Sequence, residues 1–137
     1  MPGLPKTATI TFSTSWWQSH VSNASTANGL WILNGLTRHE MGHALGLGSR
    51  WAAASLISGS VYTGVHAVAQ HSGLAIPLAD GAHWSETDFQ YDVMSLDANP
   101  DLLDVNGNVT QNGTVISAMT IGSLKDLGYQ VDPNAHD

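Results

Sequence analysis

The sequence contains no cysteine in 137 residues. Disulfide bonds, thiolate metal ligands and inhibition by a thiol from within the chain are therefore excluded. Only four residues are lysine or arginine, against eleven aspartates and glutamates, and the formal net charge is −7. So few basic residues, without any cluster, argue against nucleic acid as a partner. They also argue against docking on anionic membranes by charge.

Long apolar runs are absent as well. No stretch approaches the roughly 18–20 apolar residues of a membrane-spanning helix. Residues 1–6 (MPGLPK) do not have the pattern of a signal peptide. We therefore expect either a protein that stays where it is made or a trimmed portion of an exported precursor. A hydrophobic content of 42% fits one globular domain, residues 1–137.

The clearest local prediction is a helix over residues 26–45, where leucines and then Met41 and Ala44 recur at helical spacing. The glycine-rich segment 46–48 is expected to end it, and Ser25 to cap its start. A second helix is predicted over residues 116–127, ended by Gly128.

The other segments carry weaker signals. Residues 7–13 alternate and are rich in β-branched side chains, which predicts a strand. Short helices are predicted over residues 52–57 and 64–71, the latter with Val65, Val68 and Ala69 facing inward. Residues 73–81 are predicted to form a loop, and residues 102–115 an irregular segment or a small hairpin.

The most informative motif is HEMGHALG at residues 39–46. In a helix, His39 and His43 lie on one face about one turn apart, so both imidazoles can reach one Zn²⁺ at roughly 2.0–2.1 Å. Glu40 projects about 100° round the helix from His39, where it can take a proton from an attacking water as a general base. The competing interpretation is a helix whose two histidines are only solvated or hydrogen-bonded.

A catalytic zinc usually has three protein ligands and keeps one position for water. The residues alone leave the third ligand open. Ser49, six residues after His43, cannot serve as that ligand, because catalytic zinc takes histidine, cysteine or carboxylate ligands. Glu86 is the one candidate for a glutamate ligand, since Glu40 is the only other glutamate. The remaining histidines are His20, His66, His71, His83 and His136.

Several blocks occur in a characteristic order. They are TITF at 9–12, TRHEMGHALGLGSRW at 37–51, YTG at 62–64 followed by Ala67, HW at 83–84, DVM at 92–94 and ISAMTIGSLKDLGY at 116–129. Together they span about three-quarters of the chain. This series resembles the leishmanolysin-like branch of the metzincin metallopeptidases, in which an insertion separates the glycine after the zinc helix from the third histidine.

The resemblance implies an α+β, zincin-like fold made of the zinc helix and a loop-rich C-terminal subdomain with a Met-turn and a C-terminal helix. It makes His83 the third ligand of one catalytic Zn²⁺, beside His39 and His43, and puts Met94 beneath the metal as an apolar floor. It implies a zinc-dependent endopeptidase that acts on proteins or peptides, with Glu40 as general base and acid. It also implies secretion, because similar peptidases are exported.

The chain departs from this family at its start. Only six residues precede the strand predicted at 7–13, which resembles the strand just before the zinc helix. The substrate-gripping edge strand and the rest of the upper subdomain are therefore expected to be absent. A lone strand leaves open edges, so we expect a fragment or a minimised form with a partly open cleft or with self-association through the exposed edge.

Three other functions stay open at this point. The first is a zinc-binding but catalytically weak module that lacks a complete substrate cleft. The second is a zincin that uses Glu86 as its third ligand. The third is an interaction domain without metal.

Other residues receive supporting roles. Asp92 is expected to anchor the Met-turn by hydrogen bonds. Asp126 is expected either to orient a ligand histidine or to act as a cap or a surface residue. His66 and His71 are assigned to the surface or the cleft rim. For the oxygen-rich residues between 97 and 108, Asx-turns are favoured over a Ca²⁺ site. The tryptophans are expected to form core or cleft wall: Trp16, Trp17, Trp31, Trp51 and Trp84.

Overall fold

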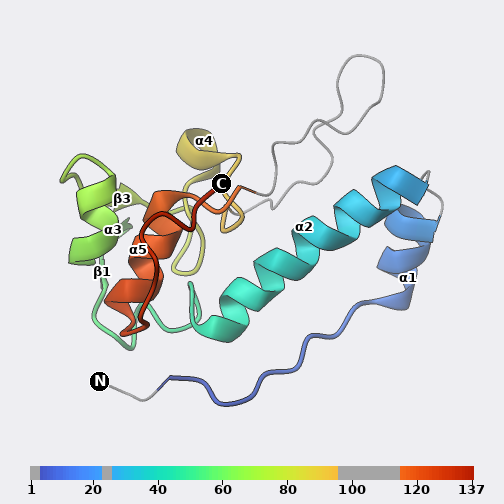
Figure 1. Ribbon diagram of the computed structural model, residues 1–137, viewed down its shortest axis with the longest axis horizontal. Helices are drawn as coiled ribbons and strands as arrows, with labels where there is room; N and C mark the ends of the chain where they lie inside the picture. The colour runs from blue at the N-terminus through green and yellow to red at the C-terminus, as the bar shows by residue number, and fades with distance from the viewer. Residues whose placement is uncertain (1–3, 23–25, 96–114) are drawn as a thin grey trace.

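A computed structural model of the protein describes residues 4–22, 26–95 and 115–137. The elements in chain order are α1 (Thr14–Trp17), the π-helix η1 (Gln18–Ser22), α2 (Thr26–Leu45), β1 (Ile57–Ser58), β2 (Val61–Tyr62), α3 (Val65–Gln70), β3 (Ile76–Pro77), α4 (Glu86–Phe89) and α5 (Ala118–Asp126). Helices and one small antiparallel sheet give the expected α+β class (Figure 1). Within the described residues, no helix is both long enough and apolar enough to cross a bilayer.

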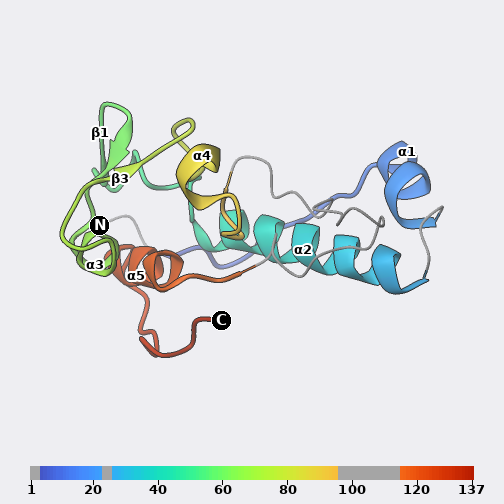
Figure 2. The ribbon, with the colours of Figure 1, turned by 90° about the horizontal axis from the view of Figure 1, so that it is seen from above.

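Helix α2 has the bounds that the sequence predicted. Its end is a Schellman motif: the N–H of Leu47 donates to the Gly42 carbonyl and that of Gly46 to the His43 carbonyl, both at 3.0 Å. Gly46 has a φ of +109°, which glycine adopts without the strain that a side chain would bring. In Figures 1 and 2, η1, which directly follows α1, lies against α2 near its start, and the second half of α2 approaches α5 and the loop-rich part of the chain.

The predicted strand at residues 7–13 is wrong. The segment is extended and runs alongside α2 in Figure 1, but it forms no ladder with any part of the chain that the structure describes. Alternation favours an extended backbone, whereas a strand also needs a partner for its N–H and C=O groups. The sheet edge through which we expected self-association is therefore not present in the described residues.

The sheet forms later in the chain, after α2. Its strands have the order β1-β2-β3, all antiparallel, with Tyr62 opposite Ile57 on one side and Ile76 on the other. The helix predicted over residues 52–57 is wrong: Ser55 has a φ of +59°, which stops helical propagation, and residue 57 enters β1. The loop predicted over residues 73–81 contains β3.

Helix α3 lies close to its predicted place but buries a different face. Val65 is 70% exposed and Ala69 is also exposed, so two of the three residues predicted to face inward do not. Ala67 is fully buried instead, because Gly122 of α5 brings the two helix backbones together and leaves no room for a β-carbon. Close approach to a neighbouring helix selects the buried face here.

Helix α5 anchors the aromatic core. It begins two residues after its predicted start, with the Ser117 side chain capping the N–H of Thr120, and ends before Gly128, whose φ is +101°. Its inner face accepts one hydrogen bond from each of three buried rings: Trp84 to Thr120 Oγ1 (3.0 Å), Trp51 to Ser123 Oγ (2.8 Å) and Tyr62 to Asp126 Oδ2 (3.1 Å).

These three rings are fully buried and in mutual contact, with centroids 4.4–5.2 Å apart. Trp51 and Trp84 are therefore core residues, as predicted. Burial raises the pKa of the Tyr62 hydroxyl, so it stays protonated and donates to Asp126. Trp17 is 39% exposed, and the side chain of Trp31 lies outside the described part. The predictions for Ser25, for the acidic run at 97–108 and for most of residues 102–115 also fall outside it.

Candidate metal centre

The structure brings together His39, His43 and His83, whose candidate ligand atoms all lie within 4.8 Å of one another. Helix α2 presents the first two, and the third enters from the loop before α4. The Nε2 atom of His43 lies 3.0 Å from Nε2 of His39 and 3.1 Å from Nε2 of His83. The rings of His39 and His83 are nearly parallel, and that of His43 stands almost perpendicular to both.

Each of these imidazoles has an acceptor at its other nitrogen. Nδ1 of His39 lies 2.6 Å from the Val93 carbonyl oxygen, and Nδ1 of His43 lies 2.9 Å from the Leu47 carbonyl oxygen. Nδ1 of His83 lies 3.0 Å from an oxygen of the Asp80 carboxylate. Because these oxygens only accept, each ring carries its proton on Nδ1 and presents the lone pair of Nε2 to the centre.

This donor set fits a divalent metal ion. Two imidazole nitrogens on a tetrahedral Zn²⁺ at roughly 2.05 Å lie about 3.3 Å apart, so the observed spacing is a few tenths of an ångström too short. Three lone pairs that face one another without protons repel, and a shared cation removes that repulsion. The trio is therefore compatible with zinc, although three imidazoles do not by themselves distinguish it from other transition metals.

Burial also favours the neutral, metal-binding form of His39. The pKa of His39 is lowered from its usual value, mainly by burial and further by the neighbouring His43 and His83. The hydrogen bond to Val93 and the negative charge of Glu40 act in the opposite direction. A neutral imidazole is the form that binds a metal ion.

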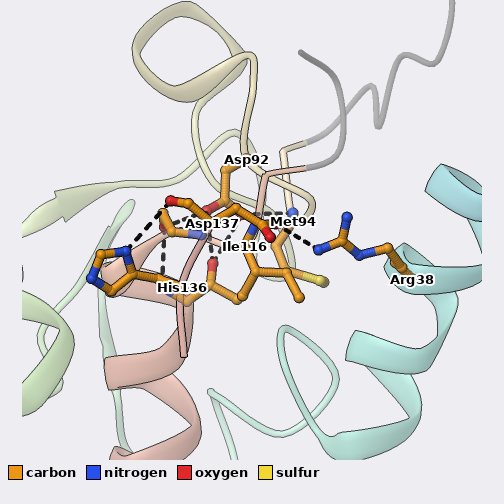
Figure 3. Close-up of polar contacts among 8 residues, drawn as sticks. Arg38, Asp92, Met94, Ile116, His136 and Asp137 are labelled. Carbon is orange, nitrogen blue, oxygen red and sulfur yellow. Dashed lines mark hydrogen bonds and ion pairs between the residues drawn. The ribbon is translucent and has the colours of Figure 1, made fainter. Parts of the chain in front are cut away.

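The predicted Met-turn is held by Asp92. Its carboxylate accepts the backbone N–H of Met94 at 2.7 Å, as Figure 3 shows, and also the hydroxyls of Ser117 and Thr120. Burial raises the pKa of Asp92, and these donors lower it in part. Met94 is fully buried, and its sulfur occupies the space that a β-carbon on Gly42 would need. Gly42 lies on α2 between His39 and His43. The prediction that Asp92 anchors this turn is confirmed.

A second carboxylate ties the chain's last segment to α2. The Asp137 side chain accepts from the Arg38 guanidinium at 2.6 Å and from the N–H of Ile116 at 2.9 Å, as Figure 3 shows. The Asp137 N–H donates back to the Ile116 carbonyl at 3.0 Å. The hydrogen bond from Ile116 and the Arg38 guanidinium hold the pKa of Asp137 below its usual value. Arg38 directly precedes His39, so this contact fixes α2 near the histidine trio.

The loop that carries His83 is pressed against the end of α2. Gly48 has a φ of +68°, and a β-carbon there would overlap the carbonyl oxygen of Ala82. The neighbouring Trp84 pairs with Leu78 and with Ser95 in isolated bridges. The loop that carries His83 is therefore held from two sides, by the turn after α2 and by the segment after Met94.

Glu40 is partly buried on α2, and its negative charge lies close enough to His39 to raise the pKa of that imidazole. None of the residues that the structure describes forms a hydrogen bond with its carboxylate. An acceptor that is not engaged by a donor is suited to take a proton from a nearby water.

The remaining candidates lie elsewhere. The described residues that group as metal ligands do not include Glu86, so the Glu86 alternative loses support. Nδ1 of His71 pairs with the Leu74 carbonyl, and His136 is exposed. His66 and Ala67 donate their N–H groups to Asp126, which therefore caps α3 and does not orient a ligand. The side chain of His20 lies outside the described part.

Sequence reasoning missed Asp80. Besides pairing with His83, it accepts the backbone N–H groups of Ala82 and His83 at 2.7 and 2.9 Å. Partial burial on its own would raise the pKa of Asp80, but these N–H donors and the His83 ring lower it overall. The sequence did carry a signal, because Asp80-Gly81 is a pair typical of Asx-turns and lies just before His83.

Comparisons with models of known protein families, with curated proteins and with solved structures find no match for this chain.

Proposed function

We propose that this chain is a zinc-dependent endopeptidase of the metzincin kind, with a zincin-like fold. The observation that carries the proposal is the convergence of three Nε2 lone pairs from distant parts of the chain. Glu40 directly follows the first of these histidines. The Met-turn geometry around Asp92 and Met94 supports the same proposal, because it orders the Val93 carbonyl that orients His39.

Bound by His39, His43 and His83, Zn²⁺ would supply Lewis acidity, which lowers the pKa of a water molecule toward neutrality and polarises a carbonyl oxygen. The Glu40 carboxylate accepts the proton of the attacking water while a C–O bond forms at the scissile carbon. It then delivers that proton to the leaving nitrogen as the C–N bond breaks. Proteins or peptides are the substrate class.

The test uses protein purified without an affinity tag, analysed for metal and for cleavage of a casein-type substrate with and without a chelator. We expect one zinc per chain and cleavage that the chelator abolishes. Glu40→Gln should retain zinc but lower cleavage about 10²–10⁴-fold, the usual contribution of a general base. Glu86→Gln, the same change at the chain's other glutamate, is the matched control and should cleave like wild type.

One observation favours a second candidate, a zinc-binding module with weak catalysis. The described residues place no strand beside α2 that could hold an extended peptide. Stoichiometric zinc without chelator-sensitive cleavage would support this candidate. Cleavage that persists in Glu40→Gln would contradict the proposed mechanism.

A further inference from the structure

His83 differs from the other two ligands in how its position is set. His39 and His43 are held on one helix, so their spacing follows from helical geometry. His83 lies in a loop, where backbone geometry alone allows many side-chain positions. Two contacts restrict the backbone conformation of this loop. They are the hydrogen bond from the Ala79 N–H to the His83 carbonyl at 3.1 Å and the bridge between Leu78 and Trp84. These contacts fix the backbone and leave the ring orientation to other groups.

The Asp80 carboxylate acts on both backbone and ring. Its Oδ1 accepts the N–H groups of Ala82 and His83, which closes the turn, and also lies 3.1 Å from Nδ1 of His83. Its Oδ2 lies 3.0 Å from the same Nδ1. The His83 side chain is 17% exposed and the Asp80 side chain 47% exposed, so the pair lies at the rim of the centre. Without this acceptor, water would compete for Nδ1 and the ring would be free to rotate.

The three acceptors also differ in chemistry. His39 and His43 pair with the backbone carbonyls of Val93 and Leu47, which no substitution removes. His83 alone pairs with a charged side chain. An anionic acceptor makes a stronger hydrogen bond than a neutral carbonyl and raises the basicity of the opposite ring nitrogen. Asp80 is thus the single partner of this trio that mutation can delete.

We propose that Asp80 is the positioning residue of the metal centre: it fixes the Nδ1–H form of His83 and directs its Nε2 toward the metal ion. This inference rests on the proposed metal site, but it does not need the peptidase activity. It predicts that Asp80 controls metal affinity through the ring of His83, and that closure of the turn by itself is not sufficient.

Asp80→Asn separates these two roles. The asparagine oxygen can still accept the two backbone N–H groups that close the turn. Toward Nδ1 of His83 it leaves only this neutral oxygen at 3.1 Å, because an amide N–H group, which cannot accept, replaces Oδ2 at 3.0 Å and the negative charge is lost. We expect Asp80→Asn to weaken Zn²⁺ binding about 10–100-fold, measured by competition with a chromophoric chelator. Asp80→Ser, whose hydroxyl can accept a turn N–H but is too short to pair with the ring, should weaken binding at least as much.

The matched control is Asp132→Asn. Asp132 closes an exposed turn by accepting the Asn134 N–H at 2.9 Å and is not among the hydrogen-bond partners of the three rings, so its variant should bind Zn²⁺ like wild type. The second readout is the visible absorption of the Co²⁺-loaded protein, which reports ligand geometry. We expect the spectrum to change in both Asp80 variants and to stay unchanged in Asp132→Asn. Thermal unfolding without metal should be alike in wild type and Asp80→Asn.

His83→Ala tells a failure of this inference from a failure of the site. If His83→Ala weakens binding while both Asp80 variants bind like wild type, the positioning role is overturned and the metal site stands. If His83→Ala also binds like wild type, the trio itself is wrong and the inference falls with it. If both sets of variants behave as expected but the wild type cleaves nothing, the peptidase proposal fails and the role of Asp80 is upheld.

Discussion

The indole nitrogen of Trp84 lies 3.0 Å from the hydroxyl oxygen of Thr120, and both residues are buried. Trp84 directly follows the third histidine of the trio. The Thr120 hydroxyl accepts from the indole and donates its own proton to Asp92, which in turn accepts the Met94 N–H. One helix, α5, therefore connects the loop that carries His83 with the turn that orients His39.

Thr120→Val tests this connection. The valine keeps the shape but leaves the buried indole N–H without an acceptor and removes a donor from Asp92. We expect a loss of about 1–3 kcal/mol in the free energy of unfolding, measured with urea, because an unpaired buried donor costs its full desolvation. Thr63→Val, at an exposed threonine that donates to the Leu56 carbonyl, should change stability by less than about 0.5 kcal/mol. Equal effects in the two variants would argue against the connection.

The close contact between Gly48 and the Ala82 carbonyl predicts a large effect of a single methyl group. Gly48→Ala would lose stability because alanine is strained at this positive φ, and its β-carbon would also displace the loop that carries His83. Gly73 has a similar φ of +77° but open space around it. Gly73→Ala should therefore lose only the backbone-strain term, about 1–2 kcal/mol in the free energy of unfolding. We expect Gly48→Ala to be clearly less stable than Gly73→Ala and to bind Zn²⁺ more weakly. Identical urea midpoints would show that the loop is not tightly seated.

The sequence predicted best what depends on neighbours along the chain. Helical spacing and a glycine stop were sufficient for α2, and the spacing of His39 and His43 follows from that helix. The glycine at 128 likewise marks the end of α5, whereas its start was predicted two residues early, before the cap at Ser117. Such signals act within a few residues, so no tertiary contact was needed to interpret them.

The sequence failed where a distant partner decides. Residues 7–13 have strand-like alternation but no partner strand in the described part, and α3 turns Ala67 inward because Gly122 lies against it. His83 was assigned by family resemblance and not by spacing, since it lies 40 positions after His43 in the sequence. Asp80 was missed because its role depends on a ring whose position only the folded chain fixes.

Removal of metal should lower stability. Two ligands lie on α2 and the third in a distant loop, so a bound ion cross-links parts of the chain that the unfolded state does not hold together. At a free Zn²⁺ concentration about 1,000 times the dissociation constant, the folded state gains about 4 kcal/mol. We expect the melting temperature to rise on zinc addition and to fall with a chelator, and to do neither in His83→Ala. An equal zinc response in that variant would point to binding elsewhere.

Asp92 predicts an unusual pH dependence of stability. Burial raises its pKa above 3.8, so the folded chain binds this proton more tightly than the unfolded chain does. Its contribution to stability is therefore present below pH 3.8 and is lost as the pH rises through the folded pKa. Urea unfolding of metal-free wild type and Asp92→Asn should show their difference shrinking in that direction. A difference that grows with pH would mean that the hydrogen bonds outweigh burial.

For Asp137 we expect the opposite dependence of stability on pH. The N–H of Ile116 and the Arg38 guanidinium lower its pKa below 3.8, so the unfolded chain binds this proton more tightly. Its contribution is present above pH 3.8 and is lost as the pH falls through the folded pKa. Because the side chain is 52% exposed, we expect less than about 1 kcal/mol, and less still at high salt. The difference in stability between wild type and Asp137→Asn should therefore vanish in acid, whereas Arg38→Gln should remove only part of it, since the Ile116 N–H remains. A difference that persists at the lowest pH would show that the Asp137 carboxylate does not hold this segment against α2.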